Sequence, residues 1–94
     1  MTVLKRYVIE RDVPGIGEMS LTELCGAARA ANQAIDQLGP ALQWQHSYVT
    51  ADKTFCVYLA ESEEAIRRHA ELSGAPATRI TEVNSVIDPL TANN

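Results

Sequence analysis

The sequence predicts an α+β protein with a ferredoxin-like βαββαβ fold, because its segments follow the order strand, helix, strand, strand, helix, strand. One segment shows the apolar spacing of an amphipathic helix after a capping residue, a second begins with a capping serine, and four others suit strands. Glycine and proline mark several of the breaks between them. This order predicts a four-stranded antiparallel sheet with both helices on one face. We expect residues 1–89 to form a single domain and residues 90–94 to form a loose C-terminal tail.

The first strand and the first helix are marked by different signals. Consecutive apolar residues at positions 7–9 predict a central strand over Val3–Arg11, buried on both faces. The run Ser-Leu-Thr-Glu from Ser20 matches a capping box, so a helix is expected to begin there and to end at Gly39-Pro40. Its apolar residues form one stripe, namely Leu21, Leu24, Ala28, Ala31, Ile35 and Leu38.

A central hairpin is predicted from two strands, Leu42–Thr50 and Thr54–Ala60, with the turn at residues 51–53. A loop of two or four residues would pair Tyr48 with Phe55. A three-residue loop would instead place two glutamines beside apolar residues, so the consistency of the pattern favours the first register. In that register one face is expected to carry Leu42, Trp44, His46, Tyr48, Phe55, Val57 and Leu59.

The second helix and the last strand complete the predicted order. Ser62 is expected to cap the helix, with acidic residues in its first turn and basic residues nearer its end, which suits the helix dipole. Ser73-Gly74 ends this helix. The last strand is predicted over Arg79–Ile87, and Asp88-Pro89 ends the fold.

Length and charge limit the possible functions. A chain of 94 residues forms one small domain with a limited core, so dimerisation would add stability. A net charge of −4 disfavours nonspecific binding to nucleic acid or to an anionic membrane. No apolar run approaches the roughly 20 residues of a membrane span, and the start lacks the apolar stretch of a signal peptide. A cytoplasmic location is therefore expected, with Cys25 and Cys56 as free thiols.

Two histidines are the candidate functional residues. His46 lies between Trp44 and Tyr48 in the hairpin, where it could be a core or interface residue, a metal ligand or a catalytic base. His69, near the end of the second helix, could be a surface residue or could bind metal at the surface together with a nearby carboxylate such as Glu64 or Glu71. The chain contains no HExxH or CxxC motif and no nucleophile–base pair. Neither a closed metal site nor a catalytic constellation is predicted.

The hairpin motif resembles a family of small bacterial ferredoxin-like proteins of formerly unknown function, often labelled nickel-binding. The motif reads W-x-H-S-Y-V-T-x-D-K-T-x-C-V-Y from Trp44, and the resemblance extends from Tyr7 to Pro89. It implies a homodimer and, for some members, divalent metal binding at the protein surface. His46 and His69 match family positions and are of ligand type, so the resemblance makes both of them candidate metal ligands.

Two functional hypotheses follow. The first is a non-enzymatic cytoplasmic homodimer that binds a divalent transition metal, nickel by resemblance, for sequestration or handling. The alternative is a small-molecule isomerase, lyase or cofactor-free oxygenase with a cavity between sheet and helices. That cavity would be lined by Trp44, His46, Tyr48 and Tyr58, with His46 as general base. The two hypotheses are distinguished by whether His46 faces a cavity of ligand size.

Overall fold

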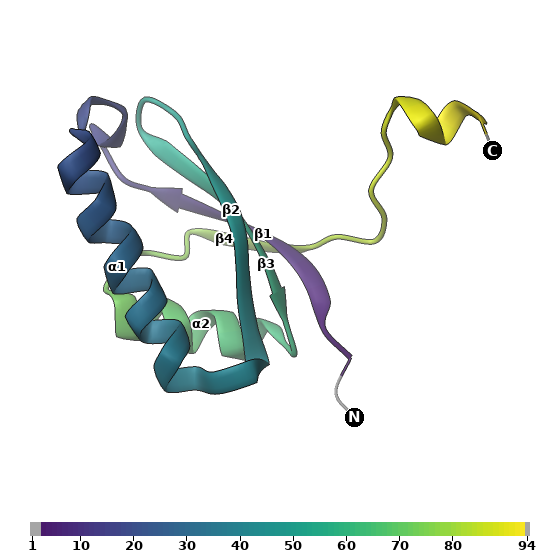
Figure 1. The fold of residues 1–94 in the computed structure, drawn as a ribbon, viewed down its shortest axis with the longest axis horizontal. Coiled ribbons are helices and arrows are strands. Elements are labelled where there is room, and N and C mark those ends of the chain that lie inside the picture. Colours follow the sequence, from purple (N-terminus) through teal and green to yellow (C-terminus); the bar gives the residue numbers. More distant parts are fainter. Residues whose placement is uncertain (1–2, 94) are drawn as a thin grey trace.

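The predicted order of elements is confirmed in the computed structural model, which describes residues 3–93 and is shown in Figure 1. The sheet has the order β2-β3-β1-β4, every neighbouring pair is antiparallel, and both helices lie on one side of it. This is the ferredoxin-like α+β arrangement. The elements are β1 (Lys5–Asp12), α1 (Leu21–Leu38), β2 (Leu42–Val49), β3 (Lys53–Ala60), α2 (Glu63–Ser73) and β4 (Arg79–Glu82), with short 3-10 helices at Ile16–Glu18, Gly39–Ala41 and Pro89–Asn93.

The helices begin and end where their capping residues predict. The Ser20 hydroxyl accepts a hydrogen bond from the Glu23 amide at 3.1 Å, and the Glu23 carboxylate accepts one from the Ser20 amide at 3.0 Å. Ser62 caps α2 in the same way, with its hydroxyl 3.2 Å from the amide of Ala65. Gly74 ends α2 with a φ of 75°, a left-handed conformation that glycine adopts without steric cost. None of the helices within residues 3–93 is long and apolar enough to span a membrane.

Near its turn, the hairpin has the register that the sequence pattern predicted. Tyr48 pairs with Phe55, and His46 pairs with Val57. All four side chains therefore project from the face of the sheet opposite to the helices, which we call the open face. The three-residue loop that would have shifted this pairing is excluded by the observed partners.

A β-bulge at Gln45 changes the register in the other half of β2. Trp44 pairs with Tyr58, so Gln45 is an extra residue with no partner in β3. The extra residue reverses the alternation, and Leu42 and Trp44 project towards the helices. The prediction that they share a face with His46 and Tyr48 is wrong for this reason.

The core lies between the sheet and the helices. β1 and β3 alternate strictly between buried and half-buried residues over their central parts. Val8 is only half-buried, so the prediction that the first strand is buried on both faces holds for the helix side alone. The cluster of buried residues consists of Tyr7, Ile9, Leu42, Cys56, Tyr58, Ala60 and Ile66.

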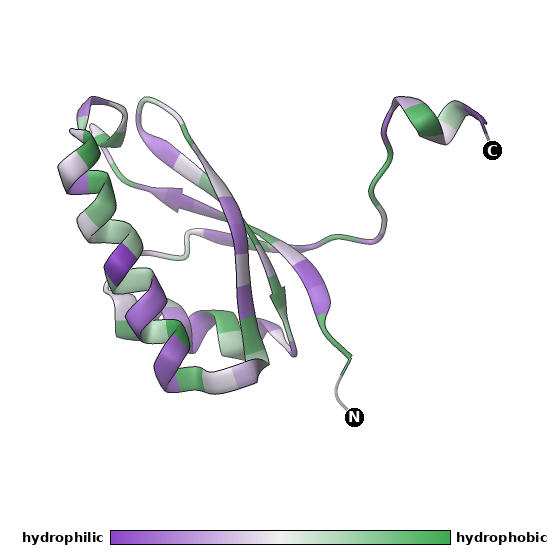
Figure 2. Cartoon of the chain, viewed as in Figure 1, coloured by the Kyte–Doolittle hydropathy of each residue, from purple (hydrophilic) through white to green (hydrophobic). Residues whose placement is uncertain are grey.

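The last strand is shorter than predicted. β4 ends at Glu82 rather than at Ile87, and the amide of Val83 donates the last backbone hydrogen bond to the sheet, 2.8 Å from the carbonyl of Arg6. The chain then leaves the body of the protein and ends in the 3-10 helix Pro89–Asn93 (Figure 1). Figure 2 shows hydrophobic residues along this segment, of which Ile87 is 78% exposed. Of the predicted domain and tail, residues 1–2 and 94 lie outside the described range.

Candidate functional site

His46 is an accessible imidazole on the open face. Its side chain is exposed, and its ring lies 5.1 Å from that of Tyr48 in an edge-on arrangement. Neither ring nitrogen forms a hydrogen bond with any residue in the range 3–93. Both nitrogens are therefore free to meet a ligand from solvent.

His69 is buried, so the prediction that it lies at the surface, alone or as a surface metal ligand, is wrong. Only 1% of the residue is exposed, and its ring lies 5.3 Å from that of Tyr58. Nε2 is 3.0 Å from the carbonyl oxygen of Ala31 in α1, so this nitrogen carries the proton and donates it. Nδ1 has no partner among the described residues. Burial lowers the pKa of His69, and the nearby Arg11 charge adds to this, while the bond to Ala31 opposes it.

The structure does not bring the two candidate histidines together. His46 is on the open face, whereas His69 packs on the helix side of the sheet. Cys56 is buried on the helix side and is a free thiol, as is the exposed Cys25. Nowhere in residues 3–93 do three or more histidine, cysteine, aspartate or glutamate side chains gather as they would around a metal ion.

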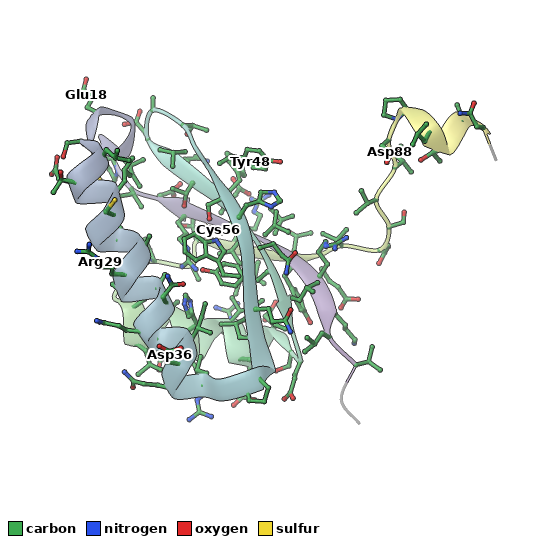
Figure 3. All side chains as sticks on the ribbon, viewed as in Figure 1. Glu18, Arg29, Asp36, Tyr48, Cys56 and Asp88 are labelled. Atoms are coloured by element: carbon green, nitrogen blue, oxygen red, sulfur yellow. The ribbon has the colours of Figure 1, made fainter. Side chains whose placement is uncertain are left out.

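A half-enclosed cavity of about 430 Å³ lies between α1 and the sheet. Trp44 and Tyr58 line it, as predicted, but His46 and Tyr48 do not, because they project from the other face. In Figure 3, Tyr48 points away from α1, whereas Cys56 lies towards it. The alternative hypothesis placed His46 in this cavity as a general base, and the observed register removes that base from it.

The bulge fixes the position of Trp44 in the wall of the cavity. The indole Nε1 of Trp44 donates a hydrogen bond to the Ser47 hydroxyl at 3.0 Å. Residues three apart in a regular strand lie on opposite faces, so this bond depends on the extra residue Gln45 between them. The aromatic wall is completed by Tyr58, whose ring stacks at 6.4 Å from that of Trp44.

Arg11 is the cavity residue that sequence reasoning missed. It is only 5% exposed, and its Nη1 donates a hydrogen bond to the carbonyl of Pro76 at 2.8 Å. Its guanidinium carbon lies 6.0 Å from the ring centroid of Tyr58. Burial raises the pKa of Tyr58 to about 12, although the Arg11 charge acts in the opposite direction, so the phenol is a neutral donor at neutral pH. The alternation of Tyr7, Ile9 and Arg11 along β1 was the signal that could have identified this arginine.

Comparison with known proteins supports the fold and decides the family. The structure is similar to that of SCO4226 from Streptomyces coelicolor A3(2), with a TM-score of 0.74, 18% sequence identity, and coverage of 87% of this chain and 99% of that chain. A family model described as nickel responsive protein SCO4226-like matches residues 7–83. The chain belongs to the SCO4226-like family. This membership confirms the resemblance inferred from the hairpin motif. A comparison with curated proteins found no match.

The burial of His69 predicts how the stability of this SCO4226-like protein depends on pH. The pKa of His69 is lowered in the folded protein, whereas the pKa of histidine in an unfolded chain is about 6.5. Below this pH the unfolded state therefore binds a proton more readily than the folded state does. The contribution of neutral His69 to the free energy of unfolding is complete above this pH and is lost as the pH falls. We expect the free energy of unfolding in urea to fall less between pH 7 and pH 5 in His69→Phe than in the unmodified protein. His46→Gln, at an exposed site, is the control, and an unchanged pH dependence in His69→Phe would contradict the assignment.

Proposed function

We propose that this protein is a non-enzymatic cytoplasmic homodimer that binds a divalent transition metal, nickel, at its open face. The observation that carries the proposal is an exposed imidazole with two free nitrogens in a chain whose family is described as nickel responsive. Imidazole is a good ligand for nickel, and also for copper and zinc. His46 is the ligand that this arrangement favours.

His69 is the weaker of the two candidate ligands. Its Nε2 is occupied by the carbonyl of Ala31, and the ring is buried between the helices and the sheet. Its other nitrogen, Nδ1, is buried and lines the cavity on the helix side, where the described residues gather no cluster of metal ligands. We therefore assign metal binding to His46 and a structural role to His69.

A second copy of the chain supplies what one protomer lacks. A metal ion requires several ligands, and a single copy gathers no suitable cluster in its described part. In a two-fold symmetric pair the same surface meets itself, so two copies of His46 could approach one another. The open face also carries half-buried apolar residues of β3, such as Val57, beside Tyr48, which is 61% exposed. The exposed Val86, Ile87 and Leu90 offer further apolar surface to a partner.

The proposal is tested by titrating nickel chloride into the protein in a calorimeter and by sedimentation at the same concentrations. We expect His46→Ala to weaken nickel binding by at least about tenfold, since a direct ligand is lost. Gln43→Ala is the matched control because Gln43 is exposed and lies on the same face of the same strand. His69→Ala should change stability without removing the nickel site. Unchanged stoichiometry and affinity in His46→Ala would exclude His46, and a strictly monomeric protein at micromolar concentration would exclude the dimer.

A further inference from the structure

The cavity between α1 and the sheet contains a positive charge without a counter-charge. Arg11 is almost fully buried, and none of the ion pairs found in residues 3–93 includes it. Its hydrogen bond to Pro76 satisfies one of the five donors of a guanidinium. A buried cation is costly unless an anion or several acceptors compensate it. An anionic group inside the cavity would supply that compensation.

Most of the remaining lining is apolar and suits an organic body rather than a free inorganic anion. Leu24, Ala28 and Ala31 of α1 form one side of the cavity, and Trp44 forms part of the other. A volume of about 430 Å³ is within the range of pockets that bind small molecules. A ligand of this shape would have one acidic end and one apolar or aromatic end.

Two further polar groups lie at the same cavity. The Tyr58 phenol is protonated at neutral pH and can donate a hydrogen bond to an anion. His69 also lines the cavity, and its buried Nδ1 lacks a partner within the part of the chain that the structure describes. A donor group on a ligand, or a bound water, would satisfy this nitrogen.

We propose that this cavity binds a small organic acid, with its carboxylate held by Arg11 and Tyr58 and its apolar body packed along α1 against Trp44. Arginine suits this task because its planar donors match the two oxygens of a carboxylate. The site lies on the opposite side of the sheet from His46. Binding of the acid needs no metal, so the failure of this proposal would not contradict nickel binding, and the reverse also holds.

The only tryptophan of the chain provides the measurement, since Trp44 lies in the cavity wall. The probe is 3-phenylpropionate, with 3-phenylpropanol as an uncharged analogue of the same shape, and both are titrated in the presence of a chelator. We expect the acid to change Trp44 fluorescence saturably and to bind about 10- to 100-fold more tightly than the alcohol, because charge-assisted hydrogen bonds are lost in the alcohol. Equal binding of the two probes, or no response to millimolar acid, would overturn the proposal.

Two variants test the positions of the acid and of the apolar body. Arg11→Met should weaken binding of the acid by about 10- to 100-fold and leave binding of the alcohol unchanged. Arg6→Met is the matched control, because Arg6 lies on the same strand and projects from the other face. Ala28→Leu fills the cavity from α1 without removing a charge and should abolish binding of both probes. If Arg11→Met does not fold, full affinity for the acid in folded Ala28→Leu would still overturn the proposal.

Discussion

Deletion of Gln43 is expected to destabilise the protein severely, whereas deletion of Gln45 is expected to be tolerated. Gln45 is the extra residue of the bulge, so its removal leaves Trp44 and His46 on their present faces in a regular strand. Removal of Gln43 shortens β2 by one residue between Leu42 and the bulge, so the pairing of β2 with β3 must shift by one residue there. Either Leu42 moves to the open face, or Trp44 moves there and Gln45 enters the core.

The expected difference between the two deletions is large. Leu42 is 2% exposed, and loss of a buried leucine from a core costs about 3 to 5 kcal/mol. Deletion of the unpaired Gln45 should change the free energy of unfolding by no more than about 1 kcal/mol. Urea unfolding followed by circular dichroism measures both values. Equal destabilisation by the two deletions would show that the bulge does not set the faces of β2.

Replacement of Ile9 by alanine should have the largest effect of any single core substitution in the sheet. Ile9 is fully buried in β1, the strand between β3 and β4, and it pairs with both Cys56 and Ile80. Truncation of a buried isoleucine to alanine costs about 2 to 5 kcal/mol, a large part of the 5 to 15 kcal/mol that is typical of a whole protein. We expect a loss near the upper end, because no part of Ile9 is exposed and the residue lies in an inner strand of the sheet.

Val8→Ala is the matched control for Ile9→Ala. Val8 is the preceding residue, projects from the open face and is half-buried. Its truncation should cost about 1 kcal/mol or less in the separate protomer. If the loss of unfolding free energy caused by Val8→Ala grows with protein concentration, the open face is buried in a dimer. Equal and concentration-independent costs at the two positions would contradict the assignment of Ile9 to the core.

Local signals made most of the fold predictable from the sequence. The capping serines, the helix-ending glycines and the turn of the hairpin act over a few residues, and the order of elements followed from them. The bulge had no such signal, because Gln45 continues an apparently regular alternation with Gln43. The faces of Leu42 and Trp44 could therefore not be placed.

The candidate site was harder to predict because its contacts join distant parts of the chain. His69 is held by Ala31, 38 residues away, and Arg11 by Pro76, 65 residues away. The alternation along β1 could have placed Arg11 on the helix side, but neither these hydrogen-bond partners nor the absence of a counter-charge can be inferred from neighbours in sequence. The length of β4 was mispredicted for a related reason. A strand extends only as far as its partner. β1 begins at Lys5, which stands opposite Asn84 in this register, so residues beyond Asn84 have no strand in this sheet to pair with.

The segment that follows Val83 makes the C-terminal region the natural site for limited proteolysis. Val86 and Ile87 lie outside any helix or strand and are 64% and 78% exposed, so a protease that cuts beside aliphatic residues can reach them. Cleavage there would leave all four strands and both helices intact. The rate of cutting would thus distinguish a free segment from one covered by a second copy of the chain, without any change to the sequence.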